Sequence, residues 1–175
     1  MNTRYGFTTR TPAMQARLAS VVGGQGVFDF GCGKGELAHW MASNGAASVP
    51  AIDKEWLVRA RSKKVRPVKD YLDQVTLPDR IAVGVTAWPV THNTPGLVPA
   101  LRRCDVVVYI GCNDRTWGTA CGTRDLFGYL VTRELLDHIP FPQNSMVVVG
   151  KPLPEGRTRE PCEAEAAGLS VDVWW

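Results

Sequence analysis

Two carboxylates bracket a glycine-rich turn near the start of this chain, and their spacing suits a ligand built on adenosine. Asp29 stands inside the apolar run Val27–Phe30, immediately before a GxGxG sequence. Asp53 ends a second apolar run about 20 residues beyond that turn. Glycines let the backbone turn tightly and approach a ligand closely, and an acid at this spacing can accept hydrogen bonds from ribose hydroxyls. The pattern therefore predicts a strand, a glycine turn, a helix and a second strand that together bind an adenosine-containing cofactor.

The glycine spacing and the first acid narrow the choice of cofactor. Dinucleotide-binding folds use GxGxxG, whereas the glycines here are Gly31, Gly33 and Gly35. A carboxylate at Asp29 would repel a pyrophosphate and attract a ligand that carries an ammonium and a sulfonium. These features favour a cationic nucleoside over a dinucleotide.

The stretch 27–36 resembles the first motif of class I S-adenosylmethionine-dependent methyltransferases, an apolar strand and an acid followed by GxGxG. The resemblance implies that Asp29 lies near the methionine end of S-adenosyl-L-methionine and that Asp53 holds the ribose hydroxyls. It also implies that the loop residues surround the cofactor, and the expected cofactor-binding set in this region is Asp29, Gly31, Cys32, Gly33, Gly35, Asp53 and Lys54.

The resemblance weakens further along the chain. The family often carries an acid that reads the adenine amino group after its third strand. The apolar run 81–85 is the expected third strand. The residues after it contain no acid, so adenine would be held by backbone groups near Ala87 and by Trp88. After the next strand, Gly111 would face the cofactor, and Asp114 is the candidate catalytic base or acceptor-orienting group. The Asn/Asp-Pro-Pro-aromatic signature of amino-directed DNA methyltransferases is absent.

Three alternatives to a methyltransferase with an unidentified acceptor stay open from the sequence. An RNA 2′-O-methyltransferase-like enzyme would use Asp114 together with Lys151, because a desolvated cation beside the acceptor lowers the barrier to forming an alkoxide. A non-catalytic cofactor-binding module is suggested by the missing adenine acid. A dinucleotide oxidoreductase is disfavoured by the glycine spacing and by Asp29.

Alternating apolar runs and amphipathic segments predict an α/β fold. The expected architecture is a Rossmann-like three-layer α/β/α sandwich with a mostly parallel six- or seven-stranded sheet, formed by residues 1–175 as one domain. The expected helices are 13–22, 36–43, 55–63, 97–103, 123–139 and 161–167. The expected strands are 27–30, 48–52, 81–85, 105–110, 146–149 and 169–174.

Composition limits the partners of the chain. With 175 residues, 45% of them hydrophobic, and a net charge of +3, it is typical of a globular domain, and a nucleic-acid acceptor is allowed but weakly supported. The densest positive stretch, 59–69, is interpreted as a solvated face or as a phosphate-binding strip. Scattered cysteines and histidines predict no metal site and a reducing, cytoplasmic location. We expect no membrane segment, and an open apolar sheet edge at the C-terminal side would favour a homodimer.

Overall fold

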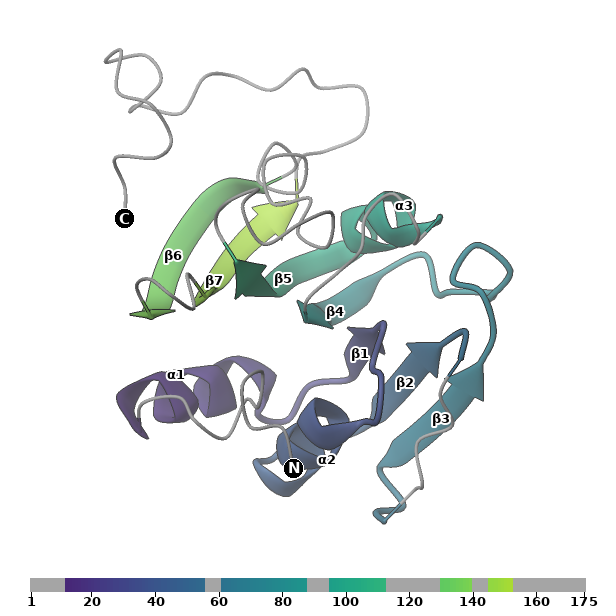
Figure 1. The fold of residues 1–175 in the computed structure, drawn as a ribbon, viewed down its shortest axis with the longest axis horizontal. Coiled ribbons are helices and arrows are strands. Elements are labelled where there is room, and N and C mark those ends of the chain that lie inside the picture. The colour runs from purple at the N-terminus through teal and green to yellow at the C-terminus, as the bar shows by residue number, and fades with distance from the viewer. Residues whose placement is uncertain (1–11, 56–60, 88–94, 113–129, 140–144, 153–175) are drawn as a thin grey trace.

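The computed structural model describes residues 12–55, 61–87, 95–112, 130–139 and 145–152, which form two helical layers around one sheet (Figure 1). The N-terminal part contains α1 (Pro12–Val22), β1 (Val27–Phe30), α2 (Glu36–Ser43), β2 (Val49–Asp53) and β3 (Val65–Lys69). The C-terminal part contains β4 (Ile81–Ala87), α3 (Leu97–Arg102), β5 (Cys104–Cys112), β6 (Leu130–Ile139) and β7 (Ser145–Pro152). None of the helices among these residues is long and apolar enough to cross a membrane.

The described strands form one seven-stranded sheet in the order β3-β2-β1-β4-β5-β7-β6. Neighbouring strands from β3 to β5 are parallel, and β7 runs antiparallel to both β5 and β6. The order reverses between β1 and β4, which places a topological switch point beside the glycine turn, where ligands of such sheets bind. The predicted mostly parallel α/β/α sandwich is confirmed, with seven strands in the described part of the chain.

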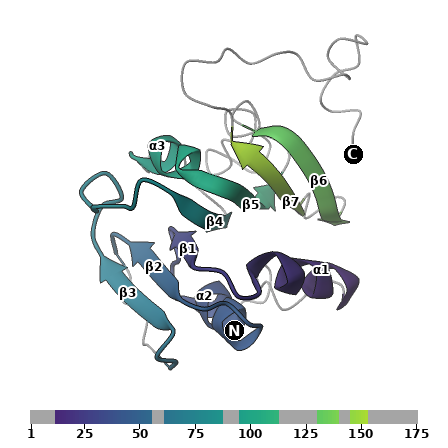
Figure 2. The same ribbon diagram turned by 180° about the vertical axis from the view of Figure 1, so that it is seen from behind.

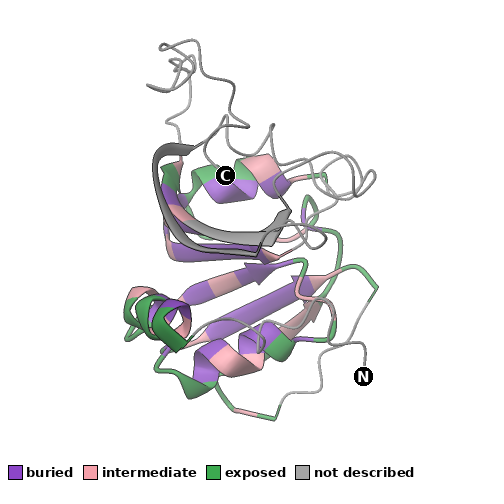
Figure 3. Ribbon diagram, turned by 60° about the vertical axis from the view of Figure 1, so that its left-hand side comes forward, coloured by how far each residue is buried: buried purple, intermediate pink, exposed green. Residues whose placement is uncertain are grey.

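The helices cover the two faces of the sheet unequally (Figures 2 and 3). α1 and α2 pack on one face, where α1 contributes a buried stripe at the four-residue spacing of a helix face, namely Met14, Leu18 and Val22. On the other face, α3 packs over Phe30, Val107 and Tyr109. The segment 71–77, between β3 and β4, covers the rest of that cluster with Leu72, Val75 and Leu77.

The segment before β3 corrects one sequence prediction. A helix was expected over 55–63, but Glu55 and residues 61–63 are not helical, and a strand that was not predicted follows at Val65. This strand pairs with β2 in parallel, with Val49 opposite Val65 and Asp53 opposite Lys69. The run 81–85 is therefore part of the fourth strand, and the third strand, after which the resemblance implies an adenine-reading acid, is β3.

The C-terminal half of the sheet corrects two further predictions. The expected long helix over 123–139 is wrong in its described part, because residues 130–139 form β6. The following strand, β7, was expected to run parallel to the others, but it runs antiparallel between β5 and β6. The expected helix over 161–167 and the expected strand over 169–174 lie outside the described residues.

Candidate cofactor site at the glycine turn

The turn after β1 is built by glycines in a conformation that other residues avoid. Gly31, Gly33 and Gly35 have φ angles of 77°, 53° and 75°, in the left-handed region where a Cβ atom is strained. A Cβ on Gly31 or Gly33 would meet no atom within 4 Å in the described part of the chain. Glycine is therefore required at these two positions by the turn geometry and not by tight packing. The backbone there is open to a ligand.

The turn leads directly into α2. The N–H group of His39 donates to the carbonyl of Gly35 over 3.0 Å, and no side chain caps the helix at Gly35. The first N–H groups of a helix lack partners within the helix and point along its axis. They lie next to the glycine turn and can donate hydrogen bonds to a ligand there.

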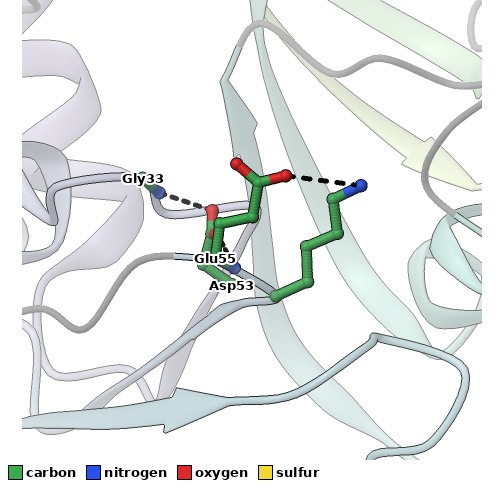
Figure 4. A network of polar contacts seen from close by, with 4 residues as sticks. Gly33, Asp53 and Glu55 are labelled. Atoms are coloured by element: carbon green, nitrogen blue, oxygen red, sulfur yellow. Dashed lines mark hydrogen bonds and ion pairs between the residues drawn. The ribbon is translucent and has the colours of Figure 1, made fainter.

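Asp53 is tied into the turn by backbone hydrogen bonds (Figure 4). Its Oδ2 accepts from the N–H of Gly33 over 2.9 Å, and its Oδ1 accepts from the N–H of Glu55 over 2.8 Å. These bonds fix the carboxylate at the carboxyl end of β2. A carboxylate has about four lone-pair sites, so it can accept ribose hydroxyls in addition to these backbone donors. The neighbouring Lys54 is exposed, and its Nζ lies 3.7 Å from the carboxylate of Glu55.

Asp29 is the unusual group of the site. Its side chain is 1% exposed, and neither carboxylate oxygen has a hydrogen-bond partner among the described residues. Its register partners in the sheet, Ala51 and Val85, belong to the core beneath α1 and α2. Burial, and secondly the negative charge of Asp53, raise the pKa of Asp29 from 3.8 to about 7. An unpartnered buried carboxyl is costly, and a cation placed against it would lower that cost.

Cys32 lies half-buried in the same turn. Burial raises the pKa of its thiol, and the charges of Asp29 and Asp53 raise it further. The thiol is therefore neutral and unreactive at physiological pH. The charges that suppress the thiolate would oppose a bound pyrophosphate in the same way.

Asp70 lies beside Asp53 and was not among the residues predicted from the sequence. It directly follows β3, its N–H donates to the backbone carbonyl of Asp53 over 3.2 Å, and its Oδ1 accepts from the N–H of Tyr71 over 2.8 Å. The sequence signal was present, an acid at the end of the run 65–69, but it was missed because these residues were interpreted as the exit of the helix expected over 55–63. The resemblance to class I methyltransferases implies an adenine-reading acid after the third strand, and Asp70 directly follows β3.

The ends of β4 and β5 lie on the other side of the glycine turn. Ala87 is half-buried and pairs with Ile110, one residue before Gly111. The buried hydroxyl of Thr86 donates to the carbonyl of Phe30 over 3.2 Å, which ties the end of β4 to the end of β1. Ala87 and Gly111 are thus placed at the predicted edge of the sheet. Trp88 and Asp114 lie outside the described residues.

Lys151 is not at this edge. The end of β5 pairs with the beginning of β7, Cys112 with Ser145, whereas Gly150 pairs with Val107. Since strands rise about 3.3 Å per residue, Lys151, six residues after Ser145, lies roughly 20 Å along the sheet from the carboxyl end of β5. The prediction that Lys151 follows a parallel strand at the ligand edge is wrong, because β7 runs in the opposite direction.

Similar solved structures agree with this architecture. An rRNA methylase from Streptococcus thermophilus shares 13% identity, with a TM-score of 0.58 over 79% of this chain and 93% of its own. An N-methyltransferase from Bradyrhizobium japonicum shares 15%, with a TM-score of 0.57 over 81% and 93%. A 16S rRNA methyltransferase of T. thermophilus, in complex with AdoMet and guanosine, shares 18%, with a TM-score of 0.57 over 85% of this chain and 45% of its own.

The chain has the class I methyltransferase fold. No protein-family model and no curated protein sequence matches it. Identities of 13–18% support the fold alone, and the names of these proteins give rRNA as the acceptor for two of them and no acceptor for the third. The acceptor of this chain must therefore be argued from its own residues.

Proposed function

We propose that this chain is an S-adenosylmethionine-dependent methyltransferase. The observation that carries the proposal is the buried, unpartnered carboxyl of Asp29 behind an open glycine turn. The methionine end of S-adenosylmethionine carries an ammonium and a sulfonium, which a carboxylate stabilises. A dinucleotide would instead bring a pyrophosphate toward Asp29 and Asp53.

Each acid has a distinct role in this proposal. Asp29 stabilises the methionine end, Asp53 accepts the ribose hydroxyls, and Asp70 accepts the adenine amino group. Because the N–H of Asp70 donates to the carbonyl of Asp53, the two nucleoside-binding acids form one backbone-linked unit. Gly31 and Gly33 allow the backbone to approach the cofactor.

The reaction requires mainly alignment by the protein. When bound, S-adenosylmethionine supplies a methyl group activated by a positively charged sulfur. The chain holds the donor in line with an acceptor at the ends of β4 and β5, near Ala87 and Gly111, and such positioning can supply about 7 kcal/mol or more of the barrier. Asp114 remains our candidate for a base or acceptor-orienting group, and Trp88 for an apolar wall of the same region.

Two alternatives, a non-catalytic cofactor-binding module and a 2′-O-methyltransferase-like enzyme, are less well supported than a methyltransferase with another acceptor. A non-catalytic module was suggested by a missing adenine acid, and Asp70, directly after β3, is a candidate for that acid. The 2′-O-methyltransferase-like alternative needed Lys151 at the ligand edge, where it does not lie. RNA remains a candidate acceptor without that lysine.

Titration calorimetry tests the proposal with S-adenosylmethionine, S-adenosylhomocysteine and NAD. We expect both adenosyl compounds to bind and NAD not to bind. Asp53→Asn and Asp70→Asn should each weaken binding by about 1–3 kcal/mol, the loss expected for a hydrogen bond to a charged group. Asp79→Asn, an exposed acid in the segment before β4, is the matched control and should bind like the wild type.

Transfer of a labelled methyl group to RNA, DNA, protein or small-molecule extracts then tests catalysis. Binding of NAD in preference to the adenosyl compounds would refute the cofactor assignment. Tight cofactor binding with no transfer to any of these extracts would refute the catalytic part.

A further inference from the structure

Five cations gather along one edge of the sheet, on β3 and on the residues that lead into it. All five side chains are exposed, and no acid interrupts the segment 61–69. The basic strip consists of Arg61, Lys63, Lys64, Arg66 and Lys69. The whole chain has a net charge of only +3, so these five positive charges leave the remaining residues with a net negative charge.

The cations of the basic strip lack ionic partners. Within the described residues, no carboxylate forms a salt bridge with any of the five. Other surface cations do pair: Lys54 with Glu55 over 3.7 Å and Arg80 with Asp105 over 2.9 Å. The unpaired charges therefore create a positive potential that a polyanion can neutralise.

The basic strip leads to the proposed cofactor site. β3 lies at the edge of the sheet and pairs only with β2 in the described part of the chain (Figures 1 and 2). Its carboxyl end continues into Asp70, which bonds to Asp53, and then into Tyr71. The ring of Tyr71 is 54% exposed, and the ammonium of Lys54 lies 5.9 Å from its centroid.

Cations on an edge strand can serve only to prevent pairing with another chain, but this role explains only some of the cations in the basic strip. Lysine and proline on edge strands prevent pairing with other chains, and Pro67, Arg66 and Lys69 can act in this way. Arg61 and Lys63 precede the ladder, which begins where the carbonyl of Lys64 accepts from the N–H of Val49 over 2.7 Å. The cations before β3 need a different explanation.

We propose that the basic strip binds the phosphodiester backbone of a single-stranded nucleic acid, which is the methyl acceptor. Lysine and arginine neutralise phosphates without reading sequence, and an exposed aromatic ring such as Tyr71 can stack on a base. The assignment as acceptor rests on the proposed function, whereas the binding itself does not. RNA and DNA share the recognised group, and the experiment separates them.

Fluorescence anisotropy tests the proposal with labelled 20-nucleotide RNA and DNA strands of one sequence, between 0.05 and 0.2 M salt. If all five cations contact phosphates, affinity for a single strand should fall about 100-fold across this range. The double variant Lys64→Gln/Arg66→Gln removes two contacts, so its loss should be about 20-fold. The control Arg17→Gln/Arg102→Gln changes the net charge equally at exposed positions on α1 and α3, and it should keep the wild-type salt dependence.

Several results would overturn the proposal: no binding of either strand at micromolar protein, an unchanged salt dependence in the strip variant, or an equal effect of the control pair. Equal binding of poly-glutamate would show a general anion surface and would also overturn it. Preference for RNA or for DNA identifies the acceptor polymer and supports the proposal.

Calorimetry with S-adenosylmethionine on the same variants separates this proposal from the proposed function. The strip variant should bind the cofactor like the wild type. Strip-dependent strand binding without cofactor binding would refute the methyltransferase and keep the nucleic-acid surface. Cofactor binding without strip-dependent strand binding would refute the surface alone.

Discussion

Asp29 should make cofactor affinity depend on pH. Its pKa is raised to about 7 because the carboxyl is buried and close to Asp53. The free protein therefore holds a proton on Asp29 below neutral pH, and a cationic ligand favours the ionised form. Binding of S-adenosylmethionine should release this proton, and the affinity should rise as the pH rises toward 7 and above.

The size of the effect follows from the pKa. If the cofactor binds only the ionised form, the apparent dissociation constant increases by the inverse of the ionised fraction. With a pKa of about 7, that factor is about 2 at pH 7 and about 30 at pH 5.5. The expected loss of affinity between these values is about 15-fold, or about 1.6 kcal/mol. The α-amino group of the ligand has an ordinary pKa of about 7.7–8.0 and stays protonated throughout.

Asp29→Asn is the matched variant, because it keeps the shape and removes the ionisable group. Calorimetry at pH 5.5 and pH 7 should show weak and pH-independent binding in this variant. Every other group that titrates in this range is still present in the variant, so a pH dependence that persists would come from one of those groups. A wild-type affinity that changes less than twofold, or a variant that keeps the wild-type pH dependence, would refute the role of Asp29.

The same carboxyl should also affect folding stability. Since the pKa is higher in the folded protein than its ordinary 3.8, the folded state binds more protons between these values, and the free energy of unfolding should fall as the pH rises from 4 to 7. A shift from 3.8 to about 7 corresponds to a loss of up to about 4 kcal/mol. Denaturant unfolding should show this loss in the wild type and not in Asp29→Asn.

Three further variants test separate features. Gly31→Ala and Gly24→Ala place a Cβ at similar positive φ with open space around it, so both should lose about 1–2 kcal/mol of stability, but only Gly31→Ala should also lose cofactor affinity in calorimetry. Gly84→Ala drives a Cβ into the Cys104 thiol and should cost about 1–3 kcal/mol in denaturant unfolding, and adding Cys104→Ala should recover part of it; full stability of the single variant would contradict the packing. Lys151→Ala should leave kcat/KM within twofold, and a tenfold loss would contradict its placement away from the site.

The fold from α1 to β2 was predictable because its signals are local. The glycine turn, the apolar run 27–30 and the amphipathic stretch 36–43 each determine their own structure, and the observed β1 and α2 have the predicted bounds. The acids Asp29 and Asp53 follow from the same motif. What the sequence could not show is that Asp29 lacks a hydrogen-bond partner, since this depends on the packing of α1 and α2 over the sheet.

The missed strands have physical causes. β3 is a five-residue edge strand with Arg66, Pro67 and Lys69, residues that suit an exposed edge but obscure an apolar pattern. β6 has register irregularities between Leu130 and Thr132 and between Leu135 and Asp137. Bulges of this kind break the alternation of a strand, so the remaining apolar spacing matched a helix. In both cases pairing with a neighbouring strand decided the structure.

Pro67 makes the two outer strands of the sheet unequal as sites for pairing with another strand. The N–H of Asp70 points toward β2, so alternation along the strand turns Pro67, which has no N–H, toward the outside. Pro67 therefore disfavours strand addition at β3, whereas β6, the other outer strand of the described sheet, contains no proline. In a two-fold dimer paired through β6, the two sheets would form one continuous sheet with a β3 strand at each end. The basic strip at each end would stay accessible to a long nucleic acid. Two nucleic-acid strands could then bind to one dimer at the same time without crossing.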